Sequence, residues 1–349
     1  MANFWGKNLG IVNLALKYTT AGWQVDKTAT TTATASTQNA DRSYVAADAT
    51  IAPLVQAEHQ GTITYVKTPI GNADFRLSTY FADVGDVTAI QVVNQAQAAY
   101  VKAYVAANLP QYAALPVLSV SAPFKSGFAG GSDYADVASG PVAIFNAADL
   151  YLFANTIQAV RVSGADVKAW LETAAKRFNQ IDPTKTTAQA LVSNFPGYNF
   201  DVLDGDAKVS YEIDVTQPVG ARIRNLKYDA APMDPAAMFV VATNNYRASG
   251  GGGFPGLDGS KTIYASPDSN RDTLISYVKA AQSIVKASNG SDRSWHFTRV
   301  ATAGPVTFTS APGLAVLAAT NGVAGVTQLL ADDGMGKGLA VYQIDLGVQ

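Results

Sequence analysis

The chain has 349 residues, of which 48% are hydrophobic and 15% are charged, and its formal net charge is -2. This balance predicts an ordinary globular protein and gives no reason to expect a nucleic-acid polymer or an acidic membrane surface as a partner. Cysteine is absent and histidine occurs only twice, which excludes disulfides, thiolate catalysis, zinc–thiolate sites and a histidine-rich metal centre. No apolar run is long enough to span a membrane, and no signal peptide is recognised at the amino terminus.

The first 66 residues predict a hairpin, a tail and a helix. Residues 3–27 hold two apolar runs separated by a turn at 19–22, and residues 28–43, rich in threonine, alanine and serine, are expected to be weakly structured. A helix is expected over 50–66, with Pro53 in its first turn. Because a lone hairpin is not a stable domain, it must pack on later parts of the chain or be the end of a missing upstream domain.

Residues 87–108 predict an amphipathic helix that carries Asn94 and Gln97 on its apolar face. Polar groups in that position need hydrogen-bond partners, either in the core or on a ligand. A short strand is expected at 117–120, and the loop after it holds Lys125. A cation there could contact a phosphate or a ribose hydroxyl, or it could simply be solvated.

The middle of the chain predicts a further strand and helix. We expect a strand over 150–162, followed by a helix that Ser163 caps and whose buried face includes Trp170. Residues 211–215 and 221–228 predict a strand pair. Strands and helices interleave without a strict alternating period, so the predicted fold class is α+β, a mixed β-sheet flanked by helices.

The organising stretch of the chain is 238–254, where a strongly apolar strand runs to Tyr246 and four glycines follow at 250–253. An aromatic ring beside side-chain-free backbone is a platform for a flat ligand such as a nucleobase. The alternative is a core tyrosine that precedes a long turn. Further along, Ser269 is expected to cap a helix. Closing strands are expected at 295–300, 306–309 and 338–346.

Common catalytic signatures are missing from the sequence. It contains no Walker sequence, no strand–GxGxxG–helix unit and no Gly-x-Ser-x-Gly elbow. The acidic pairs Asp204/Asp206 and Asp332/Asp333 lie in polar, glycine-containing segments, and we interpret them as solvated turns rather than a catalytic dyad.

Four segments of the sequence carry a resemblance to a known family. They are Ser-Ala-Pro-Phe-Lys at 121–125, Leu-Tyr-Leu-Phe-Ala-Asn-Thr-Ile-Gln at 150–158, Phe-Pro-Gly-Tyr-Asn-Phe-Asp-Val at 195–202 and Thr-Asn-Asn-Tyr-Arg-Ala-Ser-Gly-Gly at 243–251. Each segment is unspecific alone, but their order is specific. Together they resemble the C-terminal domain of the 5'-nucleotidase superfamily, with a closer match to its bacterial 2',3'-cyclic-nucleotide 2'-phosphodiesterase/3'-nucleotidase branch.

The resemblance implies a two-domain enzyme in which an N-terminal metallophosphoesterase domain holds divalent metal ions and the C-terminal domain captures the nucleoside. It assigns residues 1–45 to the terminal hairpin and tail of that missing domain, 46–66 to an interdomain linker helix and 67–349 to the nucleoside-binding domain. It also implies a periplasmic or secreted parent protein. We then expect no catalytic residue, metal ligand or cofactor in this chain, which should be inactive alone as a hydrolase.

The resemblance also implies a substrate site. In the family the base stacks between two aromatic rings, and the motif match places Phe153 and Tyr246 at those two positions. Asn155 and Asn245 flank the rings and are candidates for polar contacts to base or ribose. Lys125 falls where 5'-nucleotidases carry an arginine, so the charge is kept but the bidentate fork is lost.

Three glycines, Gly250, Gly251 and Gly252, complete the expected substrate site. Gly252 stands where 5'-nucleotidases carry a ribose-binding aspartate, and this departure favours the cyclic-phosphodiesterase branch. Other functions stay open. They are a 5'-nucleotidase, a stand-alone module for nucleosides or another flat ligand, and a structural or interaction domain in which Phe153 and Tyr246 are simply core.

Overall fold

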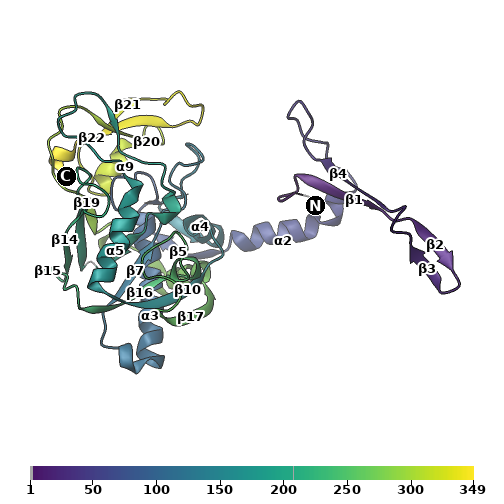
Figure 1. Ribbon diagram of the computed structural model, residues 1–349, viewed down its shortest axis with the longest axis horizontal. Coiled ribbons are helices and arrows are strands. Elements are labelled where there is room, and N and C mark those ends of the chain that lie inside the picture. The colour runs from purple at the N-terminus through teal and green to yellow at the C-terminus, as the bar shows by residue number, and fades with distance from the viewer. Residues whose placement is uncertain (1–2, 207) are drawn as a thin grey trace. The chain divides into compact units, whose positions relative to one another are not determined.

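The chain divides into two compact units, Met1–Thr64 and Tyr65–Gln349 (Figure 1). The computed structural model describes residues 3–206 and 208–349. Among them, every buried residue belongs to the second unit, and none of residues 3–64 is buried. The first unit is therefore a set of paired strands and helix without a hydrophobic core of its own.

The first unit contains two antiparallel strand pairs. β1 (Asn8–Asn13) pairs with β4 (Thr31–Ser36). The hairpin of β2 (Leu16–Thr19) and β3 (Gly22–Val25) lies between β1 and β4 in the chain. The predicted turn at 19–22 is confirmed, but the predicted weak structure at 28–43 is wrong. The threonines of that segment are β-branched and favour an extended strand once β1 supplies hydrogen-bond partners.

The helix predicted over 50–66 forms in two pieces. α1 spans Ile51–Leu54 and α2 spans Gln56–Val66, with a break at Val55. Neither helix has a buried residue. Packing therefore does not stabilise this segment within the described chain, and its helicity rests on local hydrogen bonds.

A five-stranded mixed sheet forms the middle of the second unit, which confirms the predicted α+β fold class. Its strand order is β12 (Val202–Asp204), β7 (Val117–Ser121), β16 (Met238–Asn244), β10 (Thr156–Ser163) and β17 (Thr262–Ser269). β16 is parallel to β7, whereas the other neighbouring pairs are antiparallel. Figure 1 shows β7, β16, β10 and β17 lying side by side.

The helices of the second unit include the predicted ones at 87–108 and after Ser163 and Ser269. The hydroxyl oxygens of Ser163 and Ser269 accept hydrogen bonds from backbone N–H groups three residues on, which confirms both predicted caps. The helices are α3 (Thr88–Asn108), α4 (Ile144–Leu150), α5 (Gly164–Ala174), α6 (Asn245–Ala248), α7 (Asn270–Ala281), α8 (Lys286–Asn289) and α9 (Ala315–Thr320). Short 3-10 turns are η1 (Pro110–Tyr112), η2 (Ala175–Arg177), η3 (Gly197–Asn199) and η4 (Leu346–Val348).

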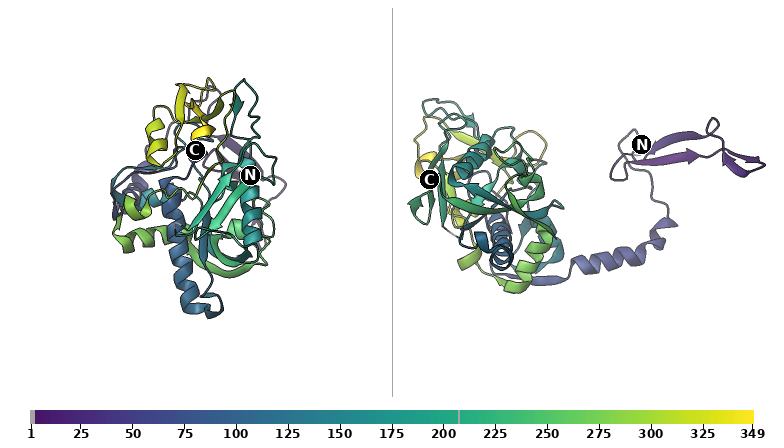
Figure 2. Two further views of the ribbon diagram at one scale, coloured as in Figure 1. Left: turned by 90° about the vertical axis from the view of Figure 1, so that its left-hand side faces the viewer. Right: turned by 60° about the horizontal axis from the view of Figure 1, so that its bottom comes forward.

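The two faces of the five-stranded sheet carry different helices, because side chains alternate along each strand. On β16, Phe239 and Val241 pack in the cluster that contains Trp170 of α5. The intervening Val240 packs in a second cluster with Val101 of α3. The sheet is therefore covered on both faces, and Figure 2 gives further views of α3 and α5 around it.

Smaller sheets surround this centre. One contains β15 (Ala231–Pro232), β14 (Ile223–Tyr228), β13 (Val209–Ile213) and β19 (Trp295–Phe297), and another contains β11 (Gln189–Ala190), β20 (Val306–Ser310), β22 (Ala340–Ile344) and β21 (Val326–Leu330). The remaining pairings join β18 (Ser283–Ile284), β5 (Pro69–Ala73) and β9 (Gly140–Ala143), and β6 (Leu77–Ser78) with β8 (Asp136–Val137). The predicted strand pair and the three closing strands are among these.

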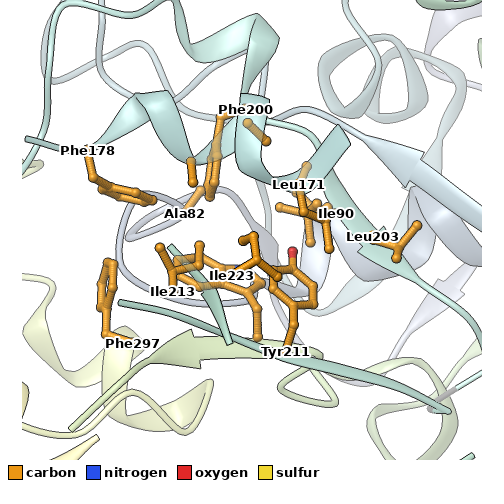
Figure 3. Packing of buried hydrophobic residues seen from close by; sticks show 14 of the residues in the cluster. Ala82, Ile90, Leu171, Phe178, Phe200, Leu203, Tyr211, Ile213, Ile223 and Phe297 are labelled. Carbon is orange, nitrogen blue, oxygen red and sulfur yellow. The ribbon is translucent and has the colours of Figure 1, made fainter. Parts of the chain in front are cut away.

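The largest hydrophobic cluster lies where α5 meets the first two of these sheets (Figure 3). Several aromatic rings contact one another within it. The ring of Phe178 lies edge-to-face against Phe200 at 5.3 Å and against Phe297 at 5.1 Å between centroids. Such edge contacts between buried rings add to the stability that burial alone provides.

Two predicted strand boundaries are wrong. The strand expected over 150–162 begins only at Thr156, because both of its partners end there: β16 ends at Asn244, opposite Ile157, and β17 ends at Ser269, opposite Thr156. Leu150 instead closes helix α4. The strand expected to reach Tyr246 ends at Asn244, whose side chain caps the short helix α6.

The two polar residues predicted on the apolar face of α3, Asn94 and Gln97, have hydrogen-bond partners in the core. The amide nitrogen of Gln97 donates to Ser119 Oγ at 2.9 Å, and Ser119 Oγ in turn donates to Asn94 Oδ1 at 3.0 Å. The core, rather than a ligand, therefore satisfies these two residues of α3. Asp204 is only 3% exposed, so its interpretation as part of a solvated turn is wrong. It ends the edge strand β12, where the side chain of Gln91 on α3 donates to its carboxylate.

Candidate functional site

The antiparallel pairing of β16 and β10 brings two distant loops together. The end of β16 lies opposite the start of β10, so the loop that precedes Thr156 lies beside helix α6. The side-chain oxygen of Asn245 accepts a hydrogen bond from the backbone N–H of Thr156 at 3.1 Å and ties the two segments together. The two ring positions predicted from sequence therefore meet at one edge of the sheet.

A pocket with a volume of about 280 Å³ opens at this edge. Four of its lining side chains are aromatic and four are polar. The lining residues are Phe124, Phe153, Asn155, Tyr198, Asp201, Asn244, Tyr246 and Arg247. The pocket combines flat apolar surfaces with a small number of fixed polar groups, which is the usual composition of a small-molecule site.

The rings of Phe153 and Tyr246 are each 45% exposed, so neither is the core side chain of the alternative interpretation. Each ring contacts a second aromatic ring at a steep angle. Phe124 meets Phe153 at 4.9 Å between centroids with an interplanar angle of 87°, and Tyr198 meets Tyr246 at 6.4 Å and 72°. Because both pairs are close to perpendicular, neither neighbour is stacked on Phe153 or Tyr246.

The predicted polar residues divide into those in the pocket and those outside it. Asn155 lines the pocket, and its amide nitrogen makes one long hydrogen bond to the Tyr151 hydroxyl at 3.4 Å. Asn245 is not among the lining residues, because its side chain accepts the hydrogen bond from the backbone N–H of Thr156. Lys125 also does not line the pocket, because its ammonium group forms an ion pair with Asp149.

The predicted glycines border the pocket without lining it. The backbone N–H of Gly251 donates to the carbonyl of Tyr246 at 2.8 Å. Gly252 has a φ of +81°, and a Cβ there would collide with Arg247 and Asn199. Gly250 also has a positive φ, +97°. These glycines let the loop fold back on α6, so they support the site rather than form its surface.

Two buried charged residues of the site were missed by the sequence reasoning. Arg247 Nε and Nη2 donate to the two carboxylate oxygens of Asp201 at 2.6 and 2.9 Å. The same guanidinium donates to the carbonyl of Tyr198 at 3.0 Å and lies 3.9 Å from the centroid of the Phe254 ring. Arg247 therefore joins α6, the 198–201 segment and the glycine loop into one unit.

A third polar residue of the pocket wall, Asn244, was also missed. Its Oδ1 accepts from the backbone N–H of Arg247 at 2.9 Å, and its amide nitrogen donates to the Tyr151 hydroxyl at 3.1 Å. Burial raises the pKa of Tyr151 to about 12, so this hydroxyl stays protonated. An asparagine that begins a short helix was the available sequence signal for Asn244. Tyr198 and Asp201 lie in the segment 195–202 that carries the resemblance, but no role was assigned to either.

Across 3–206 and 208–349, no three His, Asp or Glu side chains are arranged to hold a metal ion. In the same ranges no helix is long and apolar enough to cross a membrane. The chemistry that the described site supports is the capture of a flat, partly polar molecule.

This mixed sheet, with an aromatic pocket formed by the loops at its edge, is the architecture of a known domain family. The family model for the 5'-nucleotidase, C-terminal domain, matches residues 60–259. The chain belongs to that family, and the resemblance read from the four segments is confirmed.

Curated relatives carry more specific names. A 2',3'-cyclic-nucleotide 2'-phosphodiesterase/3'-nucleotidase of Salmonella typhimurium is 37% identical over 99% of this chain and 56% of its own length. A protein of the same name from Yersinia enterocolitica is 40% identical over 80% of this chain and 45% of its length. The chain thus spans about half of these relatives. The crystal structure of a 5'-nucleotidase precursor from Thermus thermophilus, 15% identical, covers 81% of this chain and 49% of its own with a TM-score of 0.50 and shares the fold.

Proposed function

We propose that this chain is the nucleoside-binding part of a two-domain phosphoesterase that hydrolyses 2',3'-cyclic nucleotides and 3'-nucleotides. The observation that carries the proposal is the pocket in which Phe153 and Tyr246 are two half-exposed walls. A nucleobase offers two flat faces, and aromatic rings stack on either. Each stacked ring contributes about 1–3 kcal/mol to binding and tolerates different bases.

Asn155 supplies the polar contact to the base or ribose in this proposal. Its amide lines the pocket and makes only one long hydrogen bond to the protein, so it is free to bind a ligand. Asn245 acts indirectly, because it fixes the start of β10 beside α6. Lys125 contacts a phosphate or ribose oxygen only if its ion pair with Asp149 opens.

Gly252 supports the cyclic-phosphodiesterase branch over a 5'-nucleotidase. In this loop its φ is positive, and the side chains of Arg247 and Asn199 fill the space that a Cβ would need. An aspartate that binds ribose hydroxyls, as in the 5'-nucleotidases that the sequence resembles, does not fit here. The names of the curated relatives point to the same branch.

The catalytic metals belong, in this proposal, to an upstream domain. The chain itself then contributes binding and orientation of the substrate. Residues 1–45 are then the last strands of the metallophosphoesterase domain and 46–66 a linker helix. The absence of any buried residue in 3–64 supports this assignment, because paired strands with exposed apolar side chains need a further layer to pack against. We place the parent protein in the periplasm or outside the cell, as the resemblance implies.

Hydrolysis assays on the chain alone and on the full-length parent protein test the proposal. The isolated chain, supplied with divalent metal ions, should release no phosphate from 3'-AMP. In the parent protein, Tyr246→Ala should raise KM for 3'-AMP about 5- to 100-fold, which corresponds to one lost stacking contact. Activity of the chain alone, or a variant with unchanged KM, would overturn the proposal.

A further inference from the structure

The ring of Tyr246 lies directly against the backbone of Gly251. A Cβ built on Gly251 would collide with the backbone carbonyl oxygen of Tyr246 and would lie 2.5 Å from both Cδ1 and Cε1 of the tyrosine ring, closer than real Cβ contacts. The Gly251 N–H also donates to the Tyr246 carbonyl at 2.8 Å. Only a residue without a side chain allows this approach, so the ring occupies space that any other residue at 251 would take.

Tyr198 confines the same ring from another direction. Its ring meets Tyr246 at 72°, and it is itself held in place, because Arg247 Nη2 donates to its carbonyl at 3.0 Å. Tyr198 belongs to the 3-10 turn η3, is 43% exposed and lines the pocket. The Tyr246 ring is therefore bounded by Gly251 and Tyr198 while it still lines the open pocket.

We propose that Gly251 and Tyr198 are positioning residues that fix the plane of the Tyr246 ring before the ligand arrives. The proposal rests on the function proposed above, because it concerns the wall on which the nucleobase stacks. A ring that is already ordered loses little freedom on binding, so preorganisation strengthens affinity without a new contact. Gly251 then acts through Tyr246, which agrees with its absence from the pocket lining.

A double-mutant cycle, read by calorimetric titration with adenosine, tests this role. Gly251→Ala displaces the ring and should weaken binding at least about 5-fold, as expected for most of one stacking contact. Combined with Tyr246→Ala it should cause little further loss, because the ring on which it acts is gone. Additive losses in the double variant would overturn the proposal.

Gly253→Ala is the matched control in the same loop. Gly253 has a φ of +70°, but nothing lies within 4 Å of its Cβ position, so this variant strains the backbone without touching the ring. It should weaken adenosine binding less than about 2-fold, since it leaves the stacking contact in place. An effect equal to that of Gly251→Ala would show that loop strain, and not ring contact, is responsible.

Tyr198 is tested with a conservative pair. Tyr198→Phe keeps the ring edge and should bind adenosine within about 2-fold of the wild type, whereas Tyr198→Ala should bind about 3- to 10-fold more weakly, as expected for one aromatic contact. Phe145→Ala is the control, because Phe145 is 49% exposed and does not line the pocket. Equal affinities for Tyr198→Ala and Phe145→Ala would contradict the role of Tyr198.

A ligand-free measurement separates this inference from the proposed function. With 3-fluorotyrosine at position 246, the fluorine NMR signal should be well shifted from its unfolded value. Gly251→Ala and Tyr198→Ala should each move it toward that value, and Gly253→Ala should not. Unchanged spectra would overturn the positioning role. Shifted spectra in a chain that binds no adenosine would support the positioning role and count against nucleoside capture.

Discussion

Arg247 and Asp201 form a two-point ion pair in the wall of the pocket, with side chains only 3% and 5% exposed. The indole N–H of Trp170 also donates to Asp201, at 2.7 Å, so the carboxylate receives donors from both α5 and α6. The site and the core of the sheet therefore share one polar junction. Disturbing it should affect folding and ligand binding together.

Removing one partner of this pair should be strongly destabilising. Arg247→Met leaves the carboxylate of Asp201 buried without its cation, and the free energy of unfolding should fall by about 3–5 kcal/mol. Denaturant unfolding measures the loss. Lys208→Met breaks an exposed pair with Asp229 instead, and should change stability by less than about 0.5 kcal/mol. Similar losses for the two variants would contradict the structural role of Arg247.

Three aspartates gather away from the pocket, around Gln91 of α3. The Gln91 amide nitrogen donates to Asp204 and to Asp292, each at 3.2 Å. Asp86 accepts from the hydroxyl of Ser291 at 2.9 Å. Burial, and then the negative charge of Asp292, raise the pKa of Asp86 to about 7 and that of Asp204 to about 8. Burial also raises the pKa of Asp292 itself.

This cluster predicts that stability falls as the pH rises. A carboxyl group with a raised folded-state pKa contributes stability that is fully present below its unfolded value of about 4 and is lost as the pH passes the folded-state pKa. Between pH 5 and pH 8.5 the free energy of unfolding should drop by roughly 2–4 kcal/mol. Asp204→Asn keeps the acceptor for the Gly205 N–H but removes one charge, so its drop should be smaller. Equal pH profiles would rule out the cluster as the cause.

The crowding at Gly252 predicts a cost for restoring the aspartate of 5'-nucleotidases. Gly252→Asp must accommodate a positive φ and displace Arg247, whereas Gly253→Asp meets only the positive φ. The first variant should therefore be less stable than the second by about 1–3 kcal/mol, which is typical of an overpacked site. Thermal unfolding of both proteins is the check, and equal stabilities would mean that the loop has room for a side chain at 252.

The two polar residues predicted for the site should respond differently to substitution. Asn155→Ala removes a group that lines the pocket and should weaken adenosine binding about 5- to 10-fold, as expected for one hydrogen bond. Lys125→Met removes a cation that is paired with Asp149 outside the pocket, and should leave adenosine affinity within about 2-fold. Titration of both variants with adenosine measures the two losses of affinity. A larger loss in Lys125→Met than in Asn155→Ala would place Lys125, not Asn155, at the nucleoside.

The sequence predicted the fold class and most of the elements because their apolar periods were long and clear. It missed β4 because threonine and alanine carry no hydrophobic alternation, and the strand forms only by pairing with β1. It placed the start of β10 six residues early, since an apolar run that closes α4 looks like a strand until its partner is known. The register of the strands depends on pairing between segments that are distant in the chain, so the local sequence pattern could not predict it.

The candidate site was predicted only in part, because it too depends on contacts between segments that are far apart in the chain. Phe153, Asn155 and Tyr246 line the pocket, as the resemblance implied, but Lys125 and Asn245 have structural partners instead. The two loops that carry these residues are far apart in the chain, so their polar pairing cannot be read from either one. Arg247 and Asp201 were missed because a charged residue in sequence is expected at the surface, and only the folded chain shows that each satisfies the other.

The most direct test of the account is a calorimetric titration of the purified chain with adenosine and with 3'-AMP, repeated on Tyr246→Ala. The account predicts weak but saturable binding of both ligands, with similar affinities because this chain supplies no metal for the phosphate. It also predicts that the substitution weakens binding about 5- to 100-fold, as expected for one lost stacking contact, while the chain stays folded. Equal affinity in Tyr246→Ala and the wild type, or no binding to the folded wild-type chain at millimolar ligand, would contradict capture of the nucleoside between Phe153 and Tyr246.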